Sequence, residues 1–257
     1  PGQKNIGANA DPEAIAEMLR QVRPDYVQCD TKGHDGASSY PTKVGNPCPE
    51  IACDILKLWS TVTAENGVAL LAHHSGVWDS LAMRKHPDWA VVSETGEVSG
   101  NITSVFGPYA DALLIPQLKE IALDYGLDGV WLDGECWALT VDYGKYAAQA
   151  YLAATGKQPP KKGEPGFADY MDFNREGFRR YMTHYIKEVK KAAPAFEIAS
   201  NWMYSSYVPE KKTIPLDFIS GDCFSIDSVN TARFEARSLA RQPQPWDIMA
   251  WCFNIQD

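Results

Sequence analysis

A carboxylate at the end of a short apolar segment is the first candidate for chemistry in this sequence. Residues 129–132, with the sequence Gly-Val-Trp-Leu, lead directly to Asp133, and Gly134 follows where the backbone must turn. In a barrel of parallel strands, the carboxyl ends of the strands carry the reactive groups. Asp133 is therefore the first candidate for a catalytic residue. The alternative is a structural role, in which Asp133 caps the next segment or pairs with a Lys or Arg.

Polar and aromatic side chains stand at the ends of several other apolar runs. The candidates for contacts with a bound molecule are His34, Asp35, His73, His74, Trp131, Glu135, Trp137, Asn201, Trp202 and Trp251. A second candidate for catalysis, Asp222, ends a later run. Two carboxylates that face each other across a bowl can cleave a glycosidic bond, because one attacks or activates water while the other protonates the leaving oxygen. The eight Trp side chains offer flat apolar surfaces on which sugar rings stack.

The elements that must position these residues alternate between helix and strand. Asp11 as N-cap and Pro12 at the first helical position predict a helix up to residue 22, with its apolar residues on one stripe. Further helices are predicted over about 51–65, 111–125, 143–155 and 175–192, and strands over about 26–29, 68–72, 129–132, 196–199, 218–221 and 248–251. Continuous apolar strands between helices indicate a parallel sheet covered by helices.

Polar residues at nearly every strand end predict a (β/α)8 TIM-like barrel rather than a doubly wound sheet. No G-x-G-x-x-G segment follows the early strands to support a nucleotide-binding fold. We expect residues 1–257 to form a single barrel domain. Because the predicted strands are too few to close an eight-stranded barrel, the chain is expected to be a fragment of a longer protein that lacks the first and last strands, with exposed edges.

The composition narrows the class of partner. The 257 residues include 24 Lys and Arg against 33 Asp and Glu, which gives a net charge of −9. This balance disfavours nucleic acid and anionic membranes, and no apolar run is long enough to span a bilayer. We expect a carbohydrate as the partner, no cofactor and no metal, while an oligomer is compatible with the sequence. The six cysteines are expected to be reduced, which together with the absence of an apolar leader favours a cytoplasmic protein.

Two segments resemble the α-L-fucosidase family of glycoside hydrolases. Lys32-Gly33-His34-Asp35-Gly36 is similar to the K-H-H-D-G segment of that family, and residues 125–134 are similar to its Y-G-x-x-x-x-W-F-D-G segment. The resemblance implies a TIM-like barrel with a retaining, α-L-fucosidase-like activity. It also implies that Asp133 is the nucleophile and that His34 contacts the sugar.

The acid/base residue is open between three carboxylates. The related α-galactosidase group, also made of retaining barrels, has its Asp nucleophile after the fourth strand and its Asp acid/base after the sixth. If a missing first strand is counted, Asp133 ends the fourth strand and Asp222 ends the sixth, which favours Asp222. Glu135 and Glu197 are the alternatives. In the expected mechanism, Asp133 attacks the anomeric carbon while Asp222 protonates the leaving oxygen and then activates water.

Three other functions are compatible with the same residue types. An α-galactosidase-type glycosidase could use the same residues. A catalytically inactive carbohydrate-binding barrel is indicated by Gly33, which stands where the family has its first His; His73 or His74 is the candidate for that missing contact. A metal-dependent hydrolase is suggested by the strand-end histidines. The adjacent His73 and His74 disfavour it, since their side chains diverge to opposite faces of a strand.

Overall fold

The computed structural model describes residues 4–135, 140–201, 213–223, 228–241 and 243–250. At its centre is a parallel sheet of four strands in the order β1-β2-β5-β6. These strands are β1 (Tyr26–Lys32), β2 (Ala69–Ser75), β5 (Gly129–Asp133) and β6 (Glu197–Ser200). The other strands form a parallel pair, β7 (Ile219–Cys223) with β8 (Trp246–Ala250), and an antiparallel hairpin, β3 (Ala90–Val92) with β4 (Val98–Thr103).

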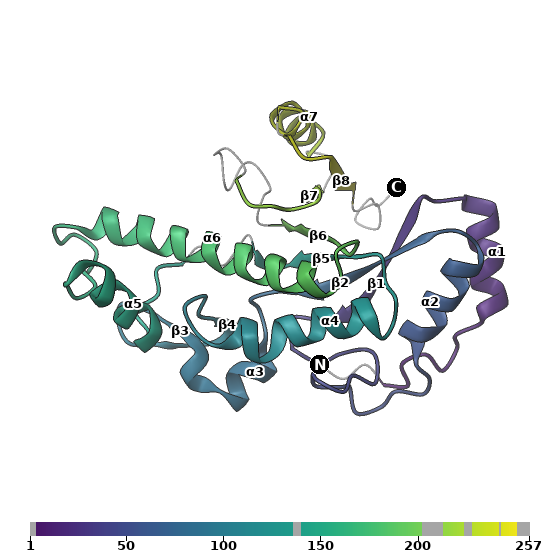
Figure 1. Cartoon of the computed structure of the whole chain (residues 1–257), viewed down its shortest axis with the longest axis horizontal. Coiled ribbons are helices and arrows are strands. Elements are labelled where there is room, and N and C mark those ends of the chain that lie inside the picture. The colour runs from purple at the N-terminus through teal and green to yellow at the C-terminus, as the bar shows by residue number, and fades with distance from the viewer. Residues whose placement is uncertain (1–3, 136–139, 202–212, 224–227, 242, 251–257) are drawn as a thin grey trace.

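Along the chain, helices lie before β1 and between β1 and β2, β2 and β5, β5 and β6, and β7 and β8. They are α1 (Pro12–Val22), α2 (Ile55–Glu65), α3 (Ser80–Lys85), α4 (Ile115–Leu123), α5 (Lys145–Thr155), α6 (Phe167–Ala192) and α7 (Ser228–Leu239), with a 3-10 turn at Pro87–Trp89 and a π turn at Ala110–Leu114. Figure 1 shows α4 and α6 side by side along the central sheet, with α1 and α2 packed together at one end. The helix α7 lies with β7 and β8 above the sheet in the same view.

Strand alternation places one face of the central sheet in the main hydrophobic core. Leu70 and Ala72 of β2, and Val130 and Leu132 of β5, are buried in the main core together with Ile198 of β6. The helices α4 and α6 contribute Leu118, Ile121, Met182, Ile186 and Val189 to the same core. Because successive side chains point to opposite faces, the residues between these core positions project from the other face, at whose carboxyl end the candidate residues lie.

The expected parallel sheet with helices between its strands is confirmed for β1, β2, β5 and β6, but the described strands do not form a closed ring of hydrogen-bonded neighbours. The segment before β7 contacts β6, since the Asp217 amide donates to the Ile198 carbonyl at 3.0 Å. On the other side, the Tyr26 hydroxyl of β1 donates to the Asp247 carboxylate of β8 at 3.0 Å. These contacts place β7 next to β6 and β8 next to β1 in the part of the chain that the structure describes.

Several predicted boundaries are wrong for identifiable reasons. The helix predicted from residue 51 begins at Ile55, because the Asp54 carboxylate caps it by accepting from the Lys57 amide at 3.1 Å. The helix predicted from residue 111 starts with the π turn, and Pro116 at its junction with α4 has no N–H to donate. The helix predicted from residue 175 begins at Phe167, directly after the left-handed Gly166. The hairpin β3–β4 was not predicted.

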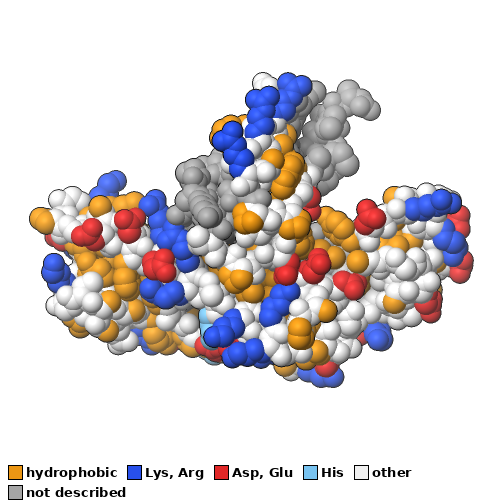
Figure 2. Space-filling model, turned by 45° about the horizontal axis from the view of Figure 1, so that its top comes forward, with side chains coloured by type: hydrophobic (Ala, Val, Ile, Leu, Met, Phe, Trp, Pro, Cys, Tyr) orange, Lys and Arg blue, Asp and Glu red, His pale blue; other side chains and the backbone are white. Residues whose placement is uncertain are grey.

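The surface carries charges of both signs. Figure 2 shows acidic and basic side chains interspersed with hydrophobic ones on one face of the molecule. Among the described residues, no helix is both long and apolar enough to cross a membrane. Cys29, Cys48 and Cys53 are free thiols.

Candidate active site at the end of strand β5

The Asp133 carboxylate lies at the carboxyl end of β5 and is surrounded by hydrogen-bond donors. Its Oδ2 atom is 3.1 Å from His73 Nε2 and 3.3 Å from His34 Nε2. Its Oδ1 atom accepts from Asn201 Nδ2 at 2.5 Å and from the Gly134 amide at 2.6 Å. The structure therefore brings together four sequence candidates, namely Asp133, His34, His73 and Asn201, from four different segments.

These donors keep Asp133 ionised. Burial disfavours its charge, but the hydrogen bonds from His34 and His73 outweigh burial and hold the pKa of the carboxyl well below its ordinary value. For His73, burial opposes the positive charge, whereas the carboxylates of Asp133 and Asp30 favour it and raise the pKa to about 9. The pair is therefore a carboxylate facing an imidazolium at neutral pH.

The loop after β1 fixes the orientation of His34. The Ser75 hydroxyl lies 2.6 Å from both His34 Nδ1 and the Trp78 carbonyl. These contacts hold the ring so that Nε2 faces Asp133, 3.3 Å from Oδ2. The Trp78 ring packs edge-on against the imidazole, with the centroids 4.9 Å apart.

Gly134 is required by both its backbone conformation and its neighbours. Its φ of +79° lies in the left-handed region, which L-residues with a side chain rarely adopt. A Cβ atom added there would lie 3.3 Å from both His34 Cε1 and Trp78 Cγ. The turn after Asp133 therefore packs directly against the residue that binds its carboxylate.

Two cavities meet at this site. One, of about 590 Å³, is lined by Trp131 and Asp133, by Asp30 and His73, and by Asp247 and Met249 from β8. The other, of about 370 Å³, is lined by His34, Asp35 and Ser39 and shares Asp30 and His73 with the first. Their sizes are suited to small sugars.

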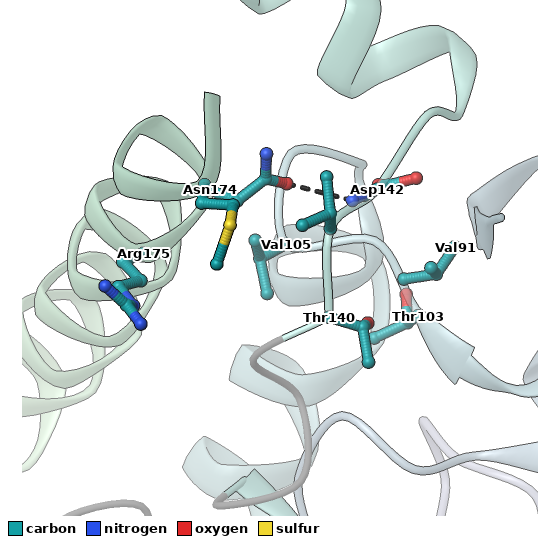
Figure 3. Close-up of a pocket in the computed structure, with 9 residues that line it drawn as sticks. Val91, Thr103, Val105, Thr140, Asp142, Asn174 and Arg175 are labelled. Atoms are coloured by element: carbon teal, nitrogen blue, oxygen red, sulfur yellow. Dashed lines mark hydrogen bonds between the residues drawn. The ribbon is translucent and has the colours of Figure 1, made fainter. Parts of the chain in front are cut away.

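A third pocket lies away from this site. It occupies about 40 Å³ between the β3–β4 hairpin and α6 and is lined by Thr103, Thr140 and Asn174, among others. Figure 3 shows the Asn174 side chain accepting a hydrogen bond from the Asp142 amide across it, at 3.0 Å. This volume is close to that of one or two water molecules and far too small for a sugar ring.

His74 and Glu135 were predicted to contact a ligand, and the structure corrects both predictions. His74 lies on the helix-facing side of β2, fully buried with Nδ1 2.9 Å from the Thr31 hydroxyl. Burial, together with the nearby Lys32 charge, holds the pKa of His74 well below its ordinary value, so its ring is neutral. Glu135 is also fully buried, and its Oε2 accepts from the hydroxyls of Tyr185 at 3.0 Å and Ser200 at 2.5 Å.

Trp131 and Asp35 both line a cavity at the site, but their contacts differ from the predicted contacts with a ligand. Trp131 lines the larger cavity but is only 2% exposed, because its ring stacks on His73 with centroids 5.2 Å apart. It supports the imidazole rather than offering a free face to a sugar. Asp35 lines the smaller cavity, where its carboxylate accepts from the Ala37 amide at 3.1 Å and shapes the loop.

The alternatives for the acid/base are placed differently. Glu197 starts β6 and pairs with Gly129, so it lies at the amino end of the sheet, opposite Asp133. This position excludes it as a partner of Asp133. Asp222 was expected after a strand end but lies within β7, where its backbone pairs with Met249. The Asp222 side chain lies outside the described part of the structure, as do Trp137, Trp202 and Trp251.

Lys32, for which no role was predicted, is fully buried behind the site. Its Nζ lies 3.3 Å from Asp79 Oδ2 and donates to the Tyr109 hydroxyl at 2.7 Å. Burial lowers the pKa of this ammonium, and the Asp79 carboxylate opposes that shift. The sequence feature that could have indicated this buried ion pair is the position of Lys32 at the end of a predicted strand, next to apolar residues.

Among the described residues, no group of His, Cys, Asp or Glu side chains is arranged to hold a metal ion.

Residues 11–134 match the model of a protein family described as hypothetical glycosyl hydrolase 6. The chain has a glycoside hydrolase-like fold. Sequence comparison with curated proteins finds no match.

Solved structures with a similar fold include two fucosidases and a galactosidase. Alpha-L-fucosidase isoenzyme 2 from Paenibacillus thiaminolyticus is 22% identical, with a TM-score of 0.65 over 77% of this chain and 30% of that one. A beta-galactosidase from the psychrophilic Marinomonas ef1 is 12% identical, with a TM-score of 0.60 over 83% and 38%. An alpha-L-fucosidase GH29 from Bacteroides thetaiotaomicron is 18% identical, with a TM-score of 0.52 over 86% and 41%. The chain thus spans less than half the length of each, and the likeness is one of fold.

Proposed function

We propose that this chain carries the catalytic site of a retaining glycosidase that removes a terminal sugar, with Asp133 as the nucleophile. The observation that carries the proposal is the ionised Asp133 carboxylate, fixed by His34, His73 and Asn201 at the end of a parallel strand, where it lines the larger cavity. A nucleophilic carboxylate must be ionised and held in one orientation, and this one is both. The proposal includes a single (β/α)8 barrel domain, which the parallel pairing and chain order of the six strands support.

The reaction would proceed in two displacements. Asp133 attacks the anomeric carbon, the bond to the leaving oxygen breaks, and an acid gives that oxygen a proton. The same group then takes a proton from water, which attacks the anomeric carbon and releases Asp133 from the glycosyl ester. We propose Asp222 as this acid/base from its place on the strand after β6. Retention requires its carboxyl group to lie about 5 to 5.5 Å from that of Asp133.

The proposed substrate is an α-L-fucoside, because the named fucosidases among the structural neighbours agree with the resemblance of residues 32–36 and 125–134. An α-D-galactoside is the next candidate. The similar fold of a beta-galactosidase argues for testing both anomers of several sugars.

A panel of aryl α- and β-glycosides, led by the α-L-fucoside and the α-D-galactoside, tests this function. We expect turnover of one α-glycoside, and Asp133→Ala should lower kcat by several orders of magnitude because the nucleophile is lost. Azide should rescue that variant and give a glycosyl azide, since a small anion fits the space that the carboxylate leaves. Asp25→Asn, an exposed carboxylate at the amino end of β1, is the matched control for loss of one charge.

The outcomes separate the alternatives. Near-native turnover by Asp133→Ala would show that Asp133 is not the nucleophile. Binding of a sugar without turnover of any glycoside by the unsubstituted protein would contradict the proposed activity and indicate a carbohydrate-binding barrel.

A further inference from the structure

Asp30, a largely exposed carboxylate at the end of β1, is connected to Asp133 through a single imidazole ring. Its Oδ1 atom lies 2.5 Å from His73 Nδ1, and the opposite nitrogen of the ring, Nε2, lies 3.1 Å from Asp133 Oδ2. The Asp30 side chain is 75% exposed, the His73 side chain 27% and the Asp133 side chain 18%. The three residues form a line from solvent to the proposed nucleophile.

The strand register builds this line. Asp30 pairs with His73 across β1 and β2, and His73 pairs with Trp131 across β2 and β5, two residues before Asp133. All four side chains project from the same face of the sheet. The Trp131 ring stacks on His73 at an interplanar angle of 24°, so the imidazole cannot turn without losing this contact.

The two carboxylates determine the protonation of the ring. A neutral imidazole has one N–H and one lone pair, and its lone pair would then face one of the two anions. The imidazolium, with an N–H on each nitrogen, donates to both. Asp30 and Asp133 are the charged groups that contact the ring, because the other nearby charges are engaged elsewhere.

Those other charges lie on the neighbouring elements. From β8, Asp247 lines the same cavity, but its carboxylate accepts from the Tyr26 hydroxyl. His34, from the loop after β1, faces Asp133 rather than His73. On β1 itself, Lys32 is buried against Asp79, behind the sheet.

We propose that Asp30 is a positioning residue, which acts through His73 to hold a charged N–H donor against the Asp133 carboxylate. The inference rests on the proposed function, in which Asp133 is the nucleophile. It adds a reason for the acidic residue at the rim of β1: Asp30 keeps the proton on His73 after Asp133 has formed an ester and lost its own negative charge. The donor is then still in place when water releases the sugar.

Histidine titration by NMR tests the first step, and it needs no enzymatic activity. The chain has five histidines, so the His73 signals are assigned by their loss in His73→Gln. We expect the His73 pKa to fall by one unit or more in Asp30→Asn, because the amide keeps an acceptor but removes the charge. Asp25→Asn, which removes one charge from the other end of the same strand, should leave it unchanged. An unchanged His73 titration in Asp30→Asn would overturn the proposal.

The pH profile of kcat/KM tests the second step. In Asp30→Asn the alkaline limb should move to lower pH by the same interval as the His73 titration, so activity is close to that of the unsubstituted protein near pH 6 and falls increasingly behind it above pH 7. An equal loss at every pH would indicate a merely structural role and would also overturn the proposal. Absence of turnover by the unsubstituted protein would instead contradict the proposed function, while the titration still decides whether Asp30 holds the proton of His73.

Discussion

The substitution Asp79→Asn, which removes the charge of the side chain but keeps its shape, tests how much the buried Lys32–Asp79 ion pair contributes to stability. The Lys32 and Asp79 side chains are both fully buried, with Nζ 3.3 Å from Oδ2. The Tyr109 hydroxyl contacts both, at 2.7 Å from Nζ and 3.0 Å from Oδ2. Asp79→Asn would leave an ammonium in the core with only neutral oxygen partners. Breaking a buried pair in this way costs about 3–5 kcal/mol, so we expect the free energy of unfolding to fall by that amount.

The chain offers a matched control. Lys43 and Asp124 form an ion pair at 3.2 Å, almost the same distance, but their side chains are 79% and 50% exposed. Exposed pairs contribute about 0–1 kcal/mol, because water screens them and two flexible side chains must be ordered. Asp124→Asn should therefore change the free energy of unfolding by less than about 1 kcal/mol.

Urea unfolding followed by circular dichroism measures these differences at constant pH. The double variant Lys32→Met, Asp79→Asn should regain much of the loss, because it removes both charges from the core. For Asp79→Asn alone, raising the pH should restore stability: the buried Lys32 then has a pKa below that of the unfolded chain, so the unfolded state binds more protons in that window. An Asp79→Asn loss no larger than that of Asp124→Asn would show that the buried ion pair contributes little. So would a loss in the double variant equal to the sum of the losses in Lys32→Met and Asp79→Asn.

Two further predictions concern the turn after Asp133. Gly134→Ala should lower the free energy of unfolding by about 1–3 kcal/mol, and by more than Gly96→Ala, because its left-handed φ and the crowding of an added Cβ by His34 and Trp78 at 3.3 Å both disfavour a side chain. Gly96→Ala, where φ is +86° and no atom lies within 4 Å of the added Cβ, is the control, and equal losses in urea unfolding would show that the contact with His34 is unimportant. For Glu135, burial and the nearby Asp133 charge raise the pKa to about 7. Between about pH 4.5 and 7 the unfolded chain has lost this proton while the folded chain keeps it, so stability should fall by about 3 kcal/mol across that window. Glu135→Gln should remove this decline, and an equal decline in both proteins would contradict the reasoning.

Local patterns in the sequence predict some of these features well. The apolar run before Asp133 predicts the strand β5, and strand alternation predicts that His73 and His74 diverge. Asp11 and Pro12 predict the start of α1, where the Asp11 carboxylate indeed accepts from the Glu13 amide at 3.0 Å. Each of these depends on residues that are close in the sequence.

Other features depend on contacts between distant segments, and the sequence did not reveal them. Glu135 follows Asp133 by two residues, yet the turn at Gly134 directs it into the core, where Tyr185 on α6 binds it. The role of Asp30 depends on the register between β1 and β2, which places it opposite His73. A local sequence pattern cannot predict that register, because Asp30 and His73 are 43 residues apart in the sequence.

The adjacent histidines of β2 also have a consequence for chemical labelling. An electrophile that acylates imidazole needs an unprotonated ring nitrogen that it can reach. His73 is reachable but protonated, because burial is outweighed by two carboxylates that raise its pKa to about 9. His74 is unprotonated but fully enclosed by the core. Both histidines should therefore be unreactive near neutral pH: the protonated His73 ring has no free lone pair, and the reagent cannot reach His74. Only in alkaline solution, where His73 loses its proton, should His73 react.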